Sequence, residues 1–445
     1  MTSFPDRLAA GADAPATCPS PDIRLAERLF TELRHRTGTA RGITRVSYGL
    51  GEQIAHDIVR REARRLGMAA EADAGGNLYL TLRGQRRGPA VIVGSHLDSV
   101  PQGGNFDGAA GVLAGLAVAA GYRAAGVLPP QDLVVMAIRA EESTWFSASY
   151  IGSRAAFGRL TATEIDTVRR AGDQVTLGDA IDAAGGDAAA LRAGRAHLDP
   201  ARIACFIEPH IEQGPVLLGE GRPVGLVTGI RGAFRHREAS CRGVYAHSGA
   251  TPRHCRQDAV LATARLVTQL DDLWRAMLEE GHALTVTFGQ FATRPEEAAF
   301  SKISGRVDFM LDIRSESLAT LDLMRTALCE AVAGIEAQCN VRFDLGPETT
   351  TEPAILDPRI IAQMADLATI QGIQTHVMPC GAGHDTAVFA QTGVPAGMLF
   401  IRNANGSHNP DEAMDIKDFA SATRLLSDFC LRDQSCLRTG KDDRQ

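Results

Sequence analysis

The chain has 445 residues, of which 44% are apolar and 22% are charged, and its formal net charge is −7. This composition is typical of globular proteins and excludes a disordered or fibrous chain. Because the length exceeds that of an average domain, we expect two to three compact units, or one large domain with an insertion. The Lys and Arg residues are scattered, so we expect small-molecule rather than nucleic-acid partners.

The cysteines and the termini indicate the cellular setting. Nine dispersed cysteines contain no C-x-x-C pair, which argues against a disulfide framework and favours reduced thiols in a cytoplasmic protein. Residues 1–20 lack a basic start followed by an apolar run, so we interpret them as a flexible tail rather than a secretory signal, and residues 433–445 as a second tail. The most continuous apolar stretch, residues 111–122, is well short of the roughly 20 residues that span a bilayer, so we expect no membrane segment.

The first half of the chain alternates between helical and strand patterns. Residues 24–66 contain two runs with apolar residues at helical spacing. They are followed by an apolar strand at 91–95, an Ala-rich helix at 108–125, a strand at 133–138, a further helical region and a strand at 203–207. This alternation predicts an α/β fold whose sheet is sandwiched by helices.

The pattern changes between residues 232 and 345. We expect a strand, a helix, two strands, a second helix and a last strand, which is the split β-α-β-β-α-β order of a ferredoxin-like α+β unit. The helix-then-strand pattern resumes at 358–372 and 395–401, so this unit is predicted to be an insertion. The predicted division is a main domain at 21–230 and 347–432, and an inserted domain at 231–346.

The strongest chemical signal is the segment VIVGSHLDSVPQGGNFDGAAGV. It places His96 and Asp98 just past a buried strand and Asp107 before a helix, in a Gly-rich turn. His96 supplies an imidazole ligand, and Asp98 can orient it by accepting its other ring proton. Asp107 has two carboxylate oxygens and can bridge two cations roughly 3.5–4 Å apart.

Three further strand ends carry residues that bind metals. The strand LVVMAI leads to Glu141 and Glu142, whose mutual repulsion a cation would relieve. We expect Glu142 to bind a metal, and Glu141 to take a proton from the metal-bound water and deliver it to the leaving group. His210 lies in IACFIEPHIEQGP and His408 in NANGSHNPDE. Three histidines and two carboxylates suit two zinc-like ions with an open water position, and leave manganese, cobalt and nickel open.

Each of these residues alone also has a structural interpretation. A single histidine near a strand end is more often a hydrogen-bonding residue than a ligand. Asp107 alone is compatible with a helix N-cap, and the paired glutamates alone with a solvated surface. The metal site is therefore predicted from the four strand ends together.

These segments resemble the amidase, hydantoinase and carbamoylase family of binuclear-metal amidohydrolases, which is related to peptidases typified by carboxypeptidase G and to aminoacylases. The resemblance runs in order through most of the chain, from about residue 42 to 412. The matching motifs are GSHLDSVPQGGNFDGAAGV, AEES, EPHIEQGPVL, HSGATP, LDIRS, GAGHD and GSHNPDE.

The resemblance implies a role for each site residue. One metal would be held by His96, Asp107 and His210, the other by Asp107, Glu142 and His408, with Glu141 as general base. The inserted domain would be a lid and a homodimerisation surface, from which His247 reaches the active site of the partner subunit. Arg314 would bind the substrate carboxylate, as a planar guanidinium fork can. Gln213 would be a further substrate contact, and His384 and Asp385 would support the site, either structurally or, as for His384 in substrate binding, by direct contact.

Two departures from the family pattern bear on the substrate. Where the family commonly has Asn-x-Ile-Pro-Gly, with the Asn touching substrate, this chain reads Ser301-Lys302-Ile303-Ser304-Gly305. The contact from Ser301 would be shorter or absent. After the paired glutamates, the usual Gly-Ser-Arg-Phe is replaced by residues 143–146, STWF, which brings Trp145 near the rim of the site.

The resemblance implies a hydrolase that acts on carbon–nitrogen bonds other than peptide bonds, with N-carbamoyl-L-amino acids, ureidopropionate or allantoate as substrates. A dipeptidase or N-acyl-amino acid deacylase would use the same metals. Ordinary peptidase relatives usually carry a carboxylate where His210 lies, which favours the carbamoylase side. A non-catalytic protein with this fold is the third alternative, and the complete ligand set with Glu141 weighs against it.

Overall fold

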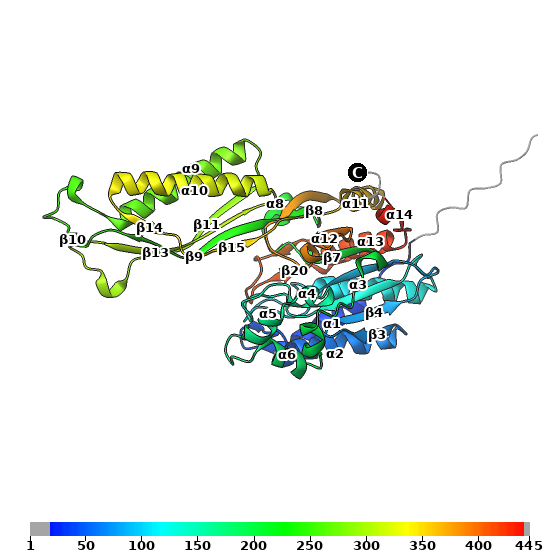
Figure 1. Cartoon of the computed structure of the whole chain (residues 1–445). Helices are drawn as coiled ribbons and strands as arrows, with labels where there is room; N and C mark the ends of the chain where they lie inside the picture. The colour runs from blue at the N-terminus through cyan, green and yellow to red at the C-terminus, as the bar shows by residue number, and fades with distance from the viewer. Residues whose placement is uncertain (1–17, 440–445) are drawn as a thin grey trace, which may run out of the picture.

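The computed structural model describes residues 18–439. The molecule is elongated: a large α/β body lies at one end, and residues 232–351 extend from it as a slender second unit (Figure 1). We call residues 232–351 the inserted unit. Residues 1–17 of the first predicted tail and 440–445 of the second lie outside the described residues, and residues 436–439 of the second form a short helix. Among the helices of residues 18–439, none has the length and apolarity that a bilayer-spanning helix needs.

A nine-stranded mixed sheet forms the centre of the body. Its order is β16-β8-β18-β7-β5-β6-β4-β3, with β17 paired to β8. The central strands β18, β7, β5 and β6 are mutually parallel and buried almost throughout, as expected for strands covered on both faces. The strands are β3 (Ala69–Ala72), β4 (Leu78–Leu82), β5 (Ala90–His96), β6 (Leu133–Ile138), β7 (Ile203–Ile211), β8 (Val224–Ile230), β16 (Ala354–Ile355), β17 (Thr375–Cys380) and β18 (Ala396–Ile401).

Helices cover both faces of this sheet and form separate apolar cores with it. On one face lie α1 (Ile23–Thr37), α2 (Leu50–Arg65), α3 (Ala109–Ala125), α11 (Pro358–Gln371) and α13 (Ile416–Cys430). On the other lie α8 (Val216–Glu220) and α12 (Thr386–Gln391). The Ala- and Gly-rich sequence of α3 has a physical reason: a Cβ atom on Gly111 would overlap the carbonyl oxygen of Pro209 in β7.

A small helical lobe follows the paired glutamates. It packs around its own apolar cluster and consists of α4 (Ile151–Ala156), α5 (Ala162–Thr167), α6 (Leu177–Ala183) and α7 (Ala188–Arg192). Short pieces complete the body: β1 (Gly38–Thr39), β2 (Gly42–Ile43), β19 (Asn403–Ala404), β20 (Ala413–Met414), η1 (Pro200–Arg202) and α14 (Cys436–Thr439).

The inserted unit has an antiparallel sheet and a core of its own. The sheet order is β11-β13-β9-β14, with β15 also on β9, and the long helices α9 and α10 pack on one face. Numbered within the unit, the order is 4-1-3-2 with the predicted β-α-β-β-α-β connection. Its elements are β9 (Gly232–Arg242), β10 (Ala246–His247), η2 (Arg253–Cys255), α9 (Ala259–Glu279), β11 (Leu284–Ala292), η3 (Pro295–Glu297), β12 (Lys302–Ile303), β13 (Arg306–Ser315), α10 (Leu318–Cys339), β14 (Arg342–Asp344) and β15 (Glu348–Thr351).

The predicted α/β fold class, a mixed sheet sandwiched by helices, is confirmed. The predicted domain boundary at residue 346 falls between β14 and β15, two strands of the same sheet. The second helix predicted for the insertion is α10, which ends at Cys339 because Asn340 adopts a left-handed backbone.

Candidate metal centre

The ends of the four parallel strands deliver the predicted ligands to one edge of the sheet. His96 is the last residue of β5, Glu142 follows β6, and His210 is the last residue but one of β7. His408 lies in the loop after β18, which the short β19–β20 pair closes at its base. Asp107 precedes α3, which packs against these strands.

The structure brings the five predicted ligands together in two groups that share Asp107. In the first group, His210 Nε2 lies 3.4 Å from His96 Nε2 and 3.7 Å from Asp107 Oδ1. In the second, His408 Nε2 lies 3.7 Å from Asp107 Oδ2 and 3.4 Å from Glu142 Oε1. Because the two oxygens of Asp107 face different groups, its carboxylate has the placement of a bridge between two cations.

Hydrogen bonds on the far side of the two buried histidines prepare them for metal binding. The Nδ1 atom of His96 faces the carbonyl oxygen and the carboxylate of Asp98, at 3.1 and 3.2 Å. The Nδ1 atom of His210 lies 2.8 Å from the carbonyl oxygen of Ile211. A proton on each Nδ1 leaves the Nε2 lone pair free, which is the arrangement of metal-bound histidines. Gly108 is required beside them, because a Cβ atom there would overlap the His96 ring.

The electrostatics of the site fit bound cations. Burial, followed by the charge of neighbouring carboxylates, raises the pKa of Glu142 well above its ordinary value. Burial and the repulsion of Glu142 and Asp385 likewise raise the pKa of Glu141, despite the opposing charge of His96. The Oε1 atom of Glu142 is buried and has no hydrogen-bond partner among the described residues. Imidazole and carboxylate donors of this kind suit zinc and other divalent transition metals.

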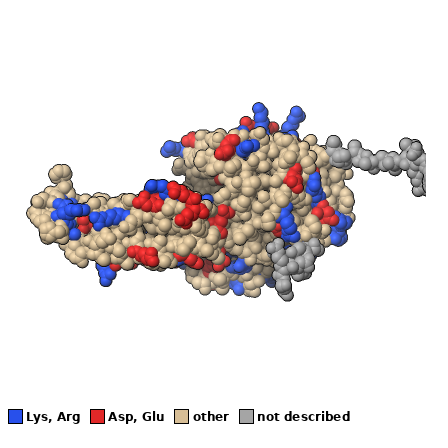
Figure 2. Space-filling model, turned by 90° about the horizontal axis from the view of Figure 1, so that it is seen from above, with Lys and Arg blue, Asp and Glu red and all other residues tan. Residues whose placement is uncertain are grey.

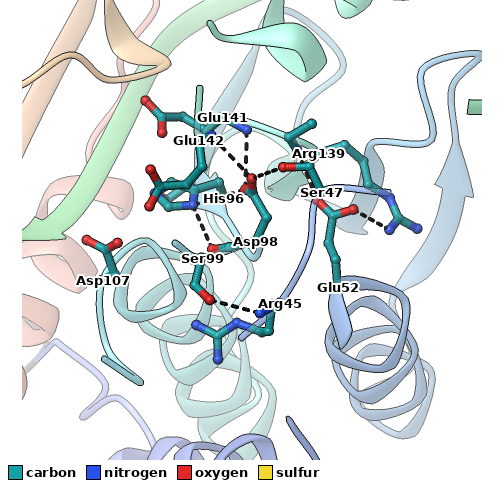
Figure 3. Close-up of polar contacts among 12 residues, drawn as sticks. Arg45, Ser47, Glu52, His96, Asp98, Ser99, Asp107, Arg139, Glu141 and Glu142 are labelled. Atoms are coloured by element: carbon teal, nitrogen blue, oxygen red, sulfur yellow. Dashed lines mark hydrogen bonds and ion pairs between the residues drawn. The ribbon is translucent and has the colours of Figure 1, made fainter. Parts of the chain in front are cut away.

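Asp98 holds the paired glutamates in place (Figure 3). Its carboxylate accepts hydrogen bonds from the backbone N–H groups of Glu141 and Glu142, each at 3.2 Å, and from the Ser47 hydroxyl at 2.6 Å. Glu52 accepts the backbone N–H of Ala140, whose φ is +50°. A buried polar network therefore fixes the turn after β6, so that Asp98 positions both His96 and the glutamates.

Glu412 is a site residue that sequence reasoning did not single out. Its carboxylate accepts the backbone N–H groups of Phe106 and Asp107, at 2.9 and 3.2 Å, and the Ser407 hydroxyl at 2.6 Å. Burial and the nearby Asp107 charge raise the pKa of Glu412 to about 7. Glu412 thus ties the loop that carries His408 to the loop that carries Asp107. The sequence signal that could have identified Glu412 is its position as the last residue of the GSHNPDE motif, which also contains His408.

A cavity of about 610 Å³ opens beside the two groups. Besides four of the five predicted ligands, the predicted residues Glu141, Gln213, Arg314 and His384 line it. Other residues of the inserted unit, from β9, β11 and β13, form one wall of this cavity. The amide nitrogen of Gln213 donates to Asp107 Oδ1 at 2.8 Å from a left-handed backbone with φ of +64°. His384 is buried, and its ring centroid lies 4.3 Å from that of His210. Within residues 18–439, neither of its ring nitrogens has a hydrogen-bond partner. Burial, then the nearby histidines, holds the pKa of His384 well below its ordinary value, so it is neutral.

Two predicted residues lie away from the cavity of their own chain. His247 in β10 pairs with Lys302 in β12, and Ser301 precedes that strand. This two-stranded β10–β12 pair is at the outer end of the inserted unit, far from the body (Figure 1). His247 is exposed there, and its Nδ1 atom accepts the backbone N–H groups of Gly249 and Ala250.

The departure at residues 143–146 has a small effect on the cavity. Of this segment only Ser143 lines it. The indole N–H of Trp145 donates to the carbonyl oxygen of Ser99 at 2.7 Å, which holds the ring against the turn after β5. Trp145 therefore does not form part of the cavity wall.

Comparisons with known proteins agree with this geometry. The family model for Peptidase family M20/M25/M40 matches residues 92–432. An N-carbamoyl-L-amino acid amidohydrolase of Geobacillus stearothermophilus is 35% identical over 86% of this chain and 92% of its own length. An allantoate amidohydrolase of Escherichia coli is 30% identical over 87% of this chain and 92% of its own length.

A solved structure, a hydantoinase/carbamoylase family amidase from Burkholderia multivorans, is similar with a TM-score of 0.84 and 27% identity, covering 94% of this chain and 99% of that one. The match of the family model spans all five predicted ligands. Enzymes of this family use a divalent metal. The chain therefore belongs to Peptidase family M20/M25/M40, and within it is similar to the hydantoinase/carbamoylase amidases.

Proposed function

We propose that this protein is a metal-dependent amidohydrolase that cleaves a carbon–nitrogen bond of a ureido or carbamoyl substrate. The observation that carries the proposal is the position of Asp107 between His96 and His210 on one side and Glu142 and His408 on the other. The relatives named N-carbamoyl-L-amino acid and allantoate amidohydrolases support the bond type. The substrates that we propose are N-carbamoyl-L-amino acids, ureidopropionate or allantoate.

The five ligands would hold two divalent ions, with zinc as our first choice and manganese, cobalt and nickel as the others. Two such ions supply a nucleophilic water at neutral pH and polarise the scissile carbonyl oxygen. Glu141 lines the same cavity and belongs to neither of the two groups that share Asp107, so its carboxylate would be free to hold the proton of the water. The environment that raises its pKa favours keeping that proton until the leaving nitrogen accepts it.

Other residues bind and orient the substrate in this proposal. Arg314 keeps one N–H on each terminal nitrogen, because only three of its five donors are used, by Asp312 and the carbonyl oxygen of Gly381. Those two donors suit a substrate carboxylate. His384, neutral and unpartnered, would accept or donate one hydrogen bond to the ureido group, and Gln213 would contact it from the side of Asp107.

We also propose that the protein acts as a cytoplasmic homodimer. His247 lies in the β10–β12 pair and Ser301 directly precedes β12, and both are outside the cavity of their own chain. In a dimer formed through the inserted unit, this pair of strands would reach the cavity of the partner subunit. There His247 would stabilise the oxyanion that develops on the carbonyl oxygen.

A substrate panel tests the proposed function. Metal-reconstituted protein is assayed for ammonia release from N-carbamoyl-L-amino acids, ureidopropionate and allantoate, and for free amino acid release from dipeptides and N-acyl-amino acids. We expect ammonia release from at least one ureido compound, and no release of free amino acids from dipeptides or N-acyl-amino acids. Turnover of dipeptides alone would make the protein a peptidase, and no turnover of any compound would favour a binding protein.

A further inference from the structure

The wall of the cavity contributed by the inserted unit is rich in arginine. Arg235, Arg237 and Arg314 line it, and Asp312 is the one carboxylate among the residues of the inserted unit that do so. Three guanidinium groups face a single carboxylate, so this wall has an excess of positive charge. The binding of one substrate carboxylate by Arg314 leaves that excess only partly neutralised.

An irregularity in the sheet lies beside Arg237 in this wall. Opposite pairs run from Phe309–Ala239 to Leu311–His236, so that Arg237 and Glu238 of β9 together oppose only Met310 of β13. A second irregularity lies beside it, at Gly289 in β11. Such bulges bend a strand and re-aim side chains, and they are common next to active sites.

Two of the arginines lie on the same strand, β9. Successive residues of a strand point to opposite faces, so the alternate residues Arg235 and Arg237 share one face of the sheet. Both line the cavity, as do Met310 and Gly289 at the level of the bulge. Alternation along β9 therefore places two guanidinium groups on the cavity wall, beside the irregular part of the sheet.

The three arginines differ in how their charge is matched. Arg235 and Arg314 both donate to the same oxygen of Asp312, at distances between 2.8 and 3.1 Å. Arg237 is exposed to the cavity and makes no hydrogen bond or ion pair with any residue of the described range 18–439. It is thus the guanidinium that is free to bind an anionic group of a ligand.

We propose that Arg237 binds a second carboxylate of the substrate, so that the preferred substrates are ureido dicarboxylic acids such as N-carbamoyl-L-aspartate. This inference rests on the proposed function. Arg314 binds the carboxylate next to the ureido nitrogen, and Arg237 binds the carboxylate of the side chain. Two carboxylates balance the excess charge of the wall, and a cavity of about 610 Å³ has the size of a small-molecule site.

The test compares two substrates of the same shape and different charge. With metal-reconstituted native protein, we expect kcat/KM for N-carbamoyl-L-aspartate to exceed that for N-carbamoyl-L-asparagine about ten-fold or more, the usual effect of a charge-assisted hydrogen bond. Arg237→Gln should remove this preference by raising KM for the aspartate compound, so that the two compounds are hydrolysed with similar kcat/KM. Arg242→Gln is the matched control, because Arg242 lies on the same strand outside the cavity and loses the same charge.

A charge reversal sharpens the test. Arg237→Glu should favour N-carbamoyl-L-lysine over N-carbamoyl-L-aspartate. Equal kcat/KM for the aspartate and asparagine compounds in the native protein, or a preference that survives Arg237→Gln, would overturn the role of Arg237 while leaving the proposed amidohydrolase intact. If neither compound nor any other ureido compound releases ammonia, the proposed function itself is wrong and this inference is wrong with it.

Discussion

The two ends of this molecule differ in how completely they are built within one chain. At the sheet edge, Asp107, His96 and His210 are buried, and each is fixed by hydrogen bonds from its surroundings. At the outer end of the inserted unit, His247 and Ser301 lie at the two-stranded β10–β12 pair, and His247 is exposed. The space-filling view shows Lys and Arg gathered toward this outer end and acidic side chains nearer the body (Figure 2).

The proposed chemistry thus has a preformed part and a part that depends on assembly. The metal groups need only the fold of the body, because adjacent parallel strands place their ends together. The β10–β12 pair gains a function only if another chain brings it to a cavity. Variants at the two ends should therefore behave differently on mixing, and loss of the general base at the sheet edge should have the largest effect.

The largest expected loss of activity is at Glu141. Glu141→Gln removes the proton carrier and leaves all five ligands, so we expect kcat to fall about 10³-fold or more with metal content unchanged. Steady-state kinetics and metal analysis of the same preparation measure both. Full activity in this variant would remove Glu141 from the mechanism.

A smaller loss, about 10²-fold in kcat, is expected for His247→Ala, because one oxyanion donor is removed. The control is His254→Ala, another exposed histidine of the outer end, which should keep native activity. Mixing Glu141→Gln with His247→Ala protein then compares the two ends directly. Random reassociation into dimers should restore about a quarter of native activity, because each mixed dimer has one cavity with both residues intact. If mixing restores nothing, His247 does not act in the partner subunit.

The smallest of these effects is expected at Glu412, which positions Asp107 without contacting substrate. Glu412→Gln replaces one acceptor oxygen by an amide nitrogen, so we expect the Kd for the metals to rise about 10-fold, as for other residues that orient ligands. The kcat at saturating metal should stay within a few-fold of native. The exposed neighbour Asp411, changed to Asn, is the control, and an equal effect there would assign the change to net charge alone.

Much of this site could be predicted from the sequence because its ligands follow strands that are recognisable as apolar runs. His96 ends the strand β5, Glu142 comes shortly after β6, and His210 lies at the end of β7. Glu412 could not be placed in this way, because its partner Asp107 is 305 positions distant along the chain. The place of Arg237 in the cavity wall was also beyond prediction, because residues of the body and of the inserted unit form this cavity together only in the folded chain.

The strands that were missed have weaker local patterns. β8 contains two glycines among its seven residues, and β3 is mostly exposed, so neither has a long apolar run. Both are defined by pairing with neighbours, β8 with β18 and β3 with β4. Tertiary pairing decides such segments more than local propensity does.

The metal content of two variants tests the sharing of Asp107 most directly. Native protein, His408→Ala and Asp107→Ala are reconstituted with zinc under identical conditions, freed of unbound metal and measured for zinc per folded chain. We expect two ions in the native protein, one in His408→Ala and none in Asp107→Ala. Circular dichroism shows whether each variant is folded. Two ions retained by folded Asp107→Ala protein would contradict the sharing of Asp107.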